Sequence, residues 1–212
     1  MTALNYQIQN NQICFAIDTL AICVKDREPA RFMTKFISLP HISTVITGTG
    51  HGEFIDAWMS FVRANMIIQD IDDLNQLGSQ SLKWIAKGFP ELNETSATIY
   101  HFGYSKSKKI YTGYAYRSSN GWSSEQLALN STGLKPAIKV RLDSSYDLPA
   151  KFIEIMKIQQ KEDNLRPRSE RVGIGGEIQF VHMKDEVVHI MTCHRFSSYE
   201  SEYEKICARQ QL

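Results

Sequence analysis

The chain has 212 residues, of which 42% are apolar and 22% charged, values typical of a globular domain with a full core. With 24 basic and 23 acidic residues its net charge is +1, so charge gives no reason to expect a nucleic-acid partner. No apolar run approaches the ~18 residues of a membrane span, and the N-terminus lacks the features of a signal peptide. We expect one domain over residues 1–212, in the cytoplasm, without a membrane partner.

The first elements predict a β-hairpin at the N-terminus. Residues 2–8 alternate between apolar and polar side chains, and residues 13–18 alternate again. Asn10 and Asn11 between them suit a tight turn, because asparagine tolerates left-handed backbone. Such a hairpin places Thr2 and Asp18 at the same end. The next apolar run, residues 32–40, carries Lys35 back towards them.

The middle of the chain predicts two helices followed by a second hairpin. Residues 43–48 form an apolar strand and lead to the glycine-rich turn 48–52. Apolar side chains then recur at helical spacing over 52–67, on two sides of the helix, and over 72–87. The β-forming runs 96–104 and 108–117 follow. We expect both helices to lie on one sheet.

The last third of the chain predicts another helix, a hairpin and a terminal helix. Residues 118–145 contain loop-like stretches, with a short strand expected at 139–142. Helical spacing returns at 149–164, the runs 172–183 and 186–196 form a hairpin, and 198–210 is helical.

Cysteine and histidine patterns give no support for a bound metal. The four cysteines show no C-x-x-C spacing, and we expect them to be buried and reduced. The late strands carry several potential ligands, but no compact ligand motif joins them: His182, His189, Cys193 and His194. Gly173-x-Gly175-Gly176 precedes a strand rather than a helix, which argues against a nucleotide site. We expect no metal and no cofactor.

The spacing of Thr2, Asp18 and Lys35 resembles that of the proteasome-type N-terminal nucleophile hydrolases, the β subunits of proteasomes and their bacterial relative HslV. Asp18 lies sixteen residues after Thr2, as in that family, and Lys35 lies seventeen after Asp18, one residue further than is usual. An apolar strand, a glycine turn and a long helix follow in the family's order. The resemblance implies an α+β fold, a four-layer αββα sandwich, and spans most of the chain.

The resemblance also implies a catalytic mechanism. After Met1 is removed, the Thr2 hydroxyl is the nucleophile and its own α-amine, with an ordinary pKa near 8, is the base. The Lys35 ammonium lowers both pKa values and Asp18 holds that lysine in place. Backbone N–H groups from Gly48 to Gly50 stabilise the oxyanion. Thr2 is small enough to let an aminopeptidase remove Met1.

Two positions depart from the family's pattern. Active members carry an aspartate and, three residues on, a serine just before two glycines. Alignment on Gly175 and Gly176 puts Arg171 and Ile174 at those places. A third supporting serine has Ser131 as its candidate. The loss of such orienting groups lowers activity more than it disturbs the fold.

Three functions therefore stay open. The first is a peptidase-like hydrolase of amide bonds, acting through Thr2 on a peptide or amide substrate. The second is a non-catalytic structural subunit of a ring, which the altered positions 171 and 174 favour. The third is a small-molecule amidohydrolase on the same fold. For each we expect a homo-oligomer, a cyclic one, because the helix at 52–67 is apolar on two sides.

Overall fold

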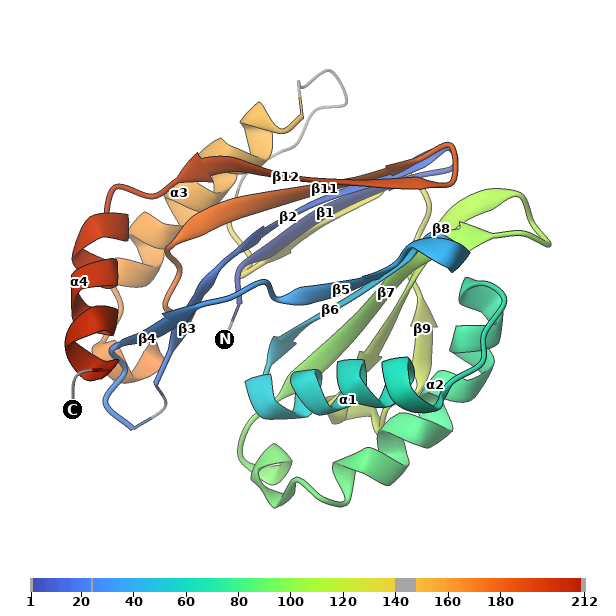
Figure 1. Ribbon diagram of the computed structural model, residues 1–212, viewed down its shortest axis with the longest axis horizontal. Coiled ribbons are helices and arrows are strands. Elements are labelled where there is room, and N and C mark those ends of the chain that lie inside the picture. Colours follow the sequence, from blue (N-terminus) through green and yellow to red (C-terminus); the bar gives the residue numbers. More distant parts are fainter. Residues whose placement is uncertain (1, 24, 140–147, 211–212) are drawn as a thin grey trace.

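Two antiparallel sheets stacked face to face form the centre of the molecule (Figure 1). The structure is a computed structural model that describes residues 2–23, 25–139 and 148–210. The first sheet has the order β10-β1-β2-β11-β12, with strands β1 (Leu4–Gln9), β2 (Gln12–Asp18), β10 (Ser131–Lys135), β11 (Glu177–Lys184) and β12 (Val187–Arg195). The second has the order β5-β6-β7-β8-β9, with strands β5 (Phe36–Leu39), β6 (Thr44–Gly50), β7 (Ala97–Ser105), β8 (Ile110–Arg117) and β9 (Ser124–Gln126).

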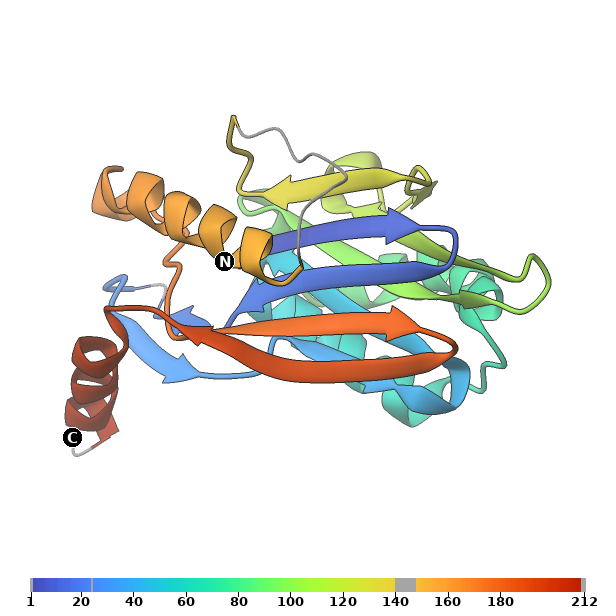
Figure 2. The ribbon, with the colours of Figure 1, turned by 90° about the horizontal axis from the view of Figure 1, so that it is seen from above.

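The described residues form the helices α1 (Gly52–Asn65), α2 (Ile71–Ala86), α3 (Ala150–Asn164) and α4 (Tyr199–Gln210), and the first three cover the outer faces of the two sheets. Both α1 and α2 lie on the second sheet, whereas α3 crosses the first (Figures 1 and 2). The predicted four-layer αββα sandwich is confirmed, with the two middle helices on one sheet. Among the described residues no helix is both long and apolar enough to cross a membrane.

A small hairpin extends beyond one end of the first sheet and carries the last helix. It consists of β3 (Leu20–Ile22) and β4 (Pro29–Phe32). The α4 helix packs against β4, where the rings of Phe32 and Tyr199 stack with centroids 4.7 Å apart. Short 3-10 turns complete the described structure: Pro40–Ile42, Pro90–Asn93, Ser118–Asn120 and Arg168–Glu170.

Side-chain alternation along β1 explains how the layers pack. Leu4, Tyr6 and Ile8 point into the core between the two sheets, as the sequence predicts. Asn5 points to the other face, where it exchanges hydrogen bonds of 2.8 and 2.9 Å with Gln159 of α3. Both amides are fully buried, and each satisfies the other. A reciprocal amide pair therefore fixes α3 over β1.

Helix α1 buries its apolar residues inside this chain. Phe54, Ile55, Trp58, Met59 and Val62 are buried against the second sheet and α2. Each such side chain contributes about 1.5–3 kcal/mol by leaving water. A subunit contact was predicted because α1 is apolar on two sides. These apolar side chains instead pack against the second sheet and α2 of the same chain.

The structure differs from the sequence prediction between residues 118 and 145. That segment was predicted as loop, but β9 pairs with β8 and β10 pairs with β1. Gly133 in β10 lies so close to Tyr6 that a Cβ would meet its ring at 2.2 Å, which explains why the strand lacks a regular apolar alternation. Residues 140–142 of the short strand predicted at 139–142 lie outside the described residues.

Candidate active site

The N-terminal hairpin places Thr2 beside Asp18. Leu4 lies opposite Ile17 in the β1–β2 register, so the residues before Leu4 meet the end of β2. The Asp18 N–H donates to the Ala3 carbonyl at 3.3 Å, and the Ala3 N–H donates to Asp18 Oδ1 at 2.9 Å. Thr2, the neighbour of Ala3, is buried, and Asp18 is fully buried. The predicted hairpin is present and brings both residues to one end.

Lys35 approaches the same carboxylate from the residue before β5. Its Nζ donates to Asp18 Oδ1 at 2.9 Å, in an ion pair whose members are 8% and 0% exposed. Thr47 Oγ1 donates to the Lys35 carbonyl at 2.9 Å and ties this backbone to β6. Burial lowers the pKa of Lys35 because the ammonium loses water, and the Asp18 carboxylate opposes that shift. A buried cation paired with the Asp18 carboxylate therefore lies at the Thr2 end of the hairpin.

The Gly48 amide lies on the edge of β6 that faces Lys35. The His51 N–H donates to the Ser96 carbonyl, across to β7. Because the amides of a strand alternate between its two neighbours, the Gly48 N–H points to the other side, towards β5. Pairing of β5 with β6 begins at Phe36, opposite Thr47. The Gly48 amide thus lies one position beyond that pair, level with Lys35.

The backbone conformation at position 50 requires a glycine. Its φ is +104°, and a Cβ there would lie 2.0 Å from the Ser96 carbonyl oxygen. Gly48 and Gly50 belong to the end of β6, whereas the sequence predicted a glycine turn opening the helix. The N-cap of α1 is His51, whose Nδ1 accepts from the Phe54 N–H at 3.2 Å.

The structure does not bring Ser131 to this cluster. Ser131 lies opposite Ile8 in the β10–β1 register, and its hydroxyl donates to the Ala128 carbonyl. Ile8 is six residues along the strand from Thr2, which is about 20 Å. The antiparallel direction of β10 therefore places Ser131 at the far end of the hairpin, and the supporting role predicted for it is not compatible with this register.

Arg171 and Ile174 provide neither an acid nor a hydroxyl near Thr2. The Arg171 guanidinium donates to the carbonyls of Asn164 at 2.8 Å and Arg166 at 3.0 Å. Ile174 is 4% exposed and belongs to the core beneath α3. The Gly175 N–H, one residue later, approaches Asp18 Oδ2 at 3.4 Å. The segment thus reaches Asp18 through its backbone.

Glu202 of α4 is a buried carboxylate that the sequence analysis missed. Its Oε2 accepts from the Gly176 N–H at 2.8 Å, next to the glycine that contacts Asp18. Burial raises the pKa of Glu202, and the nearby Asp18 charge adds to the effect. One signal was present in the sequence. Glu202 lies four residues before Ile206, and both are on the buried face of the helix.

Histidines on β11 and β12 face one another without forming a metal centre. His182 and His189 are cross-strand partners with ring centroids 6.4 Å apart. Among the described residues no group of three or more His, Cys, Asp or Glu side chains is arranged to hold a metal ion.

Comparison with known proteins places the fold. No family model and no curated protein matches the sequence. The structure is similar to that of Anbu (ancestral beta-subunit) from Yersinia bercovieri, with a TM-score of 0.65 and 8% sequence identity. The match covers 100% of this chain and 93% of that one. The chain has a proteasome-like fold. Because a fold does not imply an activity, the function of this proteasome-like chain has to be argued from its site.

Proposed function

We propose that the chain, once Met1 is removed, is a threonine-type hydrolase of amide bonds. The observation that carries the proposal is the buried Asp18–Lys35 ion pair, with its 2.9 Å contact, at the end of the hairpin that holds Thr2. Two charges withdrawn from water are costly to maintain, and side chains whose pKa is shifted by burial, as that of Lys35 is, cluster at functional sites. The proteasome-like fold is compatible with this chemistry.

The residues have separate roles in the reaction. The Thr2 hydroxyl attacks the amide carbonyl, and its proton passes to the Thr2 α-amine, which then protonates the departing amine. The Lys35 ammonium favours the neutral form of that α-amine and the ionised form of the hydroxyl. The Gly48 N–H, on the edge level with Lys35, donates to the developing oxyanion. Water then hydrolyses the ester on Thr2 and restores the enzyme.

Intact mass and covalent labelling test this proposal together. We expect purified protein to lack one methionine and to form one covalent adduct with a peptide electrophile that reacts with threonine hydroxyls. Thr2→Ala should abolish labelling, Lys35→Ala should nearly abolish it, and Asp18→Asn should reduce it less. Thr95→Ala removes an exposed threonine hydroxyl and serves as the control. Full retention of Met1, or equal labelling of Thr2→Ala, would contradict the proposal.

A non-catalytic assembly subunit is the second candidate. Two residues favour it: Ile174 is buried in the core, and Arg171 donates to the backbone carbonyls of Asn164 and Arg166, so neither supports a nucleophile. In that case no variant hydrolyses amides or takes up the electrophile, while the protein still folds and assembles. If labelling succeeds, a panel of peptides and small amides separates a peptidase from a small-molecule amidohydrolase. A cytoplasmic location stays a prediction.

We further propose that the chain forms a homo-oligomer, as a ring. The contact predicted on α1 is used internally, but α2 exposes Trp84 at 64% and Leu77 at 46%. Large exposed apolar side chains on one helix are suited to a subunit contact. Light scattering should give a mass several times 24.2 kDa, and Trp84→Glu should reduce it. Gln76→Glu, also exposed on α2, is the control. A monomer mass for the wild type at all micromolar concentrations would refute the proposal.

A further inference from the structure

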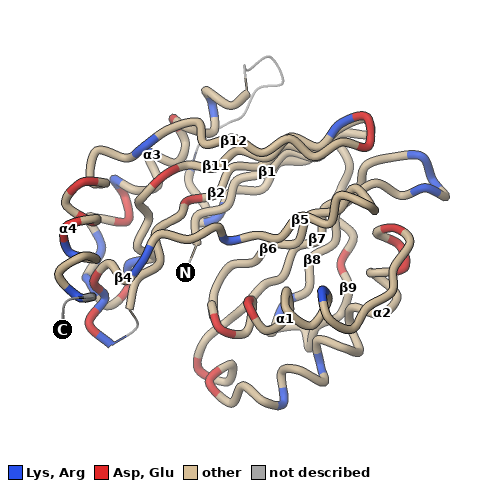
Figure 3. Tube along the Cα trace, viewed as in Figure 1, with Lys and Arg blue, Asp and Glu red and all other residues tan. Residues whose placement is uncertain are grey.

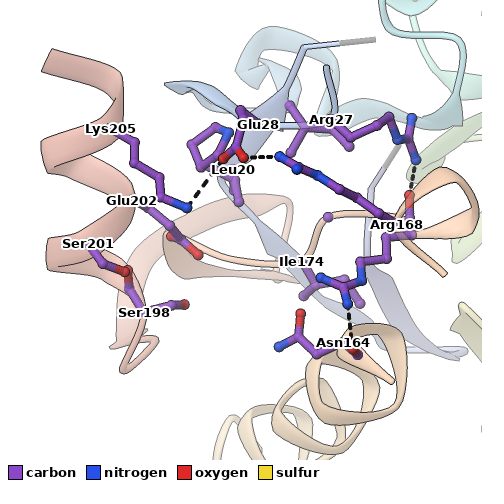
Figure 4. A pocket seen from close by; sticks show the side chains of 14 residues that line it. Leu20, Arg27, Glu28, Asn164, Arg168, Ile174, Ser198, Ser201, Glu202 and Lys205 are labelled. Carbon is purple, nitrogen blue, oxygen red and sulfur yellow. Dashed lines mark hydrogen bonds and ion pairs between the residues drawn. The ribbon is translucent and has the colours of Figure 1, made fainter. Parts of the chain in front are cut away.

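A cavity of about 410 Å³ lies between α4, the β3–β4 hairpin and the segment after α3 (Figure 4). Thr2, Asp18 and Lys35 do not line it, but Glu202 and Ile174 do, so the cavity adjoins the candidate active site without containing its proposed catalytic residues. Its volume is within the ~300–1,000 Å³ of small-molecule sites. Lys, Arg, Asp and Glu residues are frequent along α4 and β4, at this end of the molecule (Figure 3). The charged side chains of its lining are those of Arg27, Glu28, Arg168, Arg171, Glu202 and Lys205.

Two of the lining guanidinium groups bond to neutral partners. Arg27 Nη2 donates to the Arg171 carbonyl, and Arg27 Nε is buried without a hydrogen-bond partner among the described residues. Arg171 donates to the carbonyls of Asn164 and Arg166. Backbone carbonyls satisfy donors without cancelling charge. Both positive charges therefore remain to attract an anion, and the buried Arg27 Nε still has a hydrogen to donate.

The other two cations share one carboxylate. Arg168 bonds to Glu28 Oε1, and Lys205 Nζ bonds to Glu28 Oε2 at 3.3 Å, as Figure 4 shows. Glu202 is the second carboxylate of the lining, and burial raises its pKa. The cavity thus has four cationic and two acidic side chains, an excess of two positive charges.

We propose that this cavity binds a phosphate monoester of a small organic molecule. A phosphate monoester carries about −1.5 to −2 charges at pH 7, which matches the excess, whereas a monocarboxylate carries only one. Guanidinium groups present paired N–H donors that fit phosphate oxygens. Leu20, Ile22 and Ile174 supply an apolar wall for the organic part.

Substitutions at Glu28 and at its cationic partners should change phosphate binding in opposite directions. The Glu28 carboxylate forms ion pairs with Arg168 and Lys205, so a bound phosphate must compete with it for these two side chains. Removing a cation should weaken binding, while Glu28→Gln should strengthen it. General damage to the cavity would weaken binding in every variant, so opposite effects distinguish recognition from misfolding.

Titration calorimetry with phenyl phosphate measures the binding without any need for activity. We expect saturable binding that Arg168→Gln weakens about tenfold or more, because it removes a charge-assisted contact. Lys205→Gln is the second variant if Arg168→Gln fails to fold, and Lys161→Gln on the exposed side of α3 is the control. Inorganic phosphate should bind more weakly because it lacks the apolar part, and benzoate should bind more weakly because it carries one charge.

Three results would overturn the proposal. The first is no saturable binding of phenyl phosphate at millimolar concentrations. The second is equal weakening by Lys161→Gln and Arg168→Gln. The third is benzoate binding as tightly as phenyl phosphate, which would assign the cavity to monocarboxylates. None of these results depends on whether Thr2 is catalytic.

Discussion

Replacing Asp18 by Asn should destabilise the protein in a way that depends strongly on pH. The substitution keeps the side chain's size but removes the carboxylate that pairs with the buried Lys35 ammonium. The Asp18 carboxylate opposes the lowering of the Lys35 pKa by burial, so in the folded variant this pKa falls further below its ordinary value of 10.5. Each unit of further lowering costs up to about 1.4 kcal/mol of stability. Breaking a buried ion pair by removing one partner costs about 3–5 kcal/mol, and we expect a loss of that size at pH 7.

Urea unfolding at pH 7, 8 and 9 measures this effect. Wherever Lys35 has lost its proton in the folded variant but keeps it in the unfolded chain, the stability of the variant rises with pH relative to the wild type. The difference in unfolding free energy between Asp18→Asn and wild type should therefore shrink from pH 7 to pH 9, by up to about 1.4 kcal/mol for each pH unit. The slope of unfolding against urea should not change.

The matched control is Asp56→Asn, which removes an exposed partner. Asp56 lies 3.9 Å from Arg31, with side chains 48% and 63% exposed. Such surface pairs contribute about 0–1 kcal/mol, so this variant should lose little stability and show no comparable pH dependence. An Asp18→Asn variant that loses the same free energy at pH 7 and pH 9, or no more than Asp56→Asn, refutes the argument.

Three further predictions concern stability. Burial lowers the pKa of His101 to about 3 from 6.5. The stability gained by keeping His101 neutral is therefore complete above about pH 6.5 and is lost as the pH falls towards 3. His101→Gln, measured by urea unfolding, should flatten this acid loss, whereas the exposed His41→Gln should not. Glu202→Gln keeps an acceptor for the Gly176 N–H and should be at least as stable as wild type at pH 7, while Glu202→Leu should lose about 1–3 kcal/mol. Gly50→Ala should lower the free energy of unfolding by about 3 kcal/mol or more, measured by thermal unfolding. Gly52→Ala is the control and should change little, because the space around Gly52 is open. Equal effects of the two substitutions would contradict the close backbone approach at Gly50.

Local sequence determined the main elements because their signals are local. Alternation in residues 2–8 and 13–18 predicts β1 and β2, since only one face of each strand enters the core between the sheets. The helices predicted at 52–67 and 72–87 are observed as α1 and α2 within two residues at each end. The spacing of apolar residues within one segment shows which of its faces will be buried, so the element can be predicted without knowing which segments pack against it.

Pairing between distant segments could not be read in this way. Strand β10 joins the first sheet through β1, more than a hundred residues earlier, and Gly133 interrupts its pattern to make room for Tyr6. The register of that pair, rather than any feature of the residues around Ser131, places this serine at the end of the hairpin away from Thr2. A shift of register changes every neighbour while leaving the sequence pattern the same.

Some residues of the candidate site could likewise be predicted from local sequence, and others only from the tertiary structure. The hairpin and the returning strand, both read from local sequence, bring Lys35 into contact with Asp18 and put Thr2 at the same end of the hairpin, while the catalytic roles of the three residues stay a proposal. The role of Glu202 was decided only by tertiary structure, since α4 has to pack against β4 before its carboxylate reaches the Gly176 amide. The charge balance of the cavity beside it has the same origin. Burial and electrostatic partners depend on distances through space, and pairing across the whole chain sets those distances.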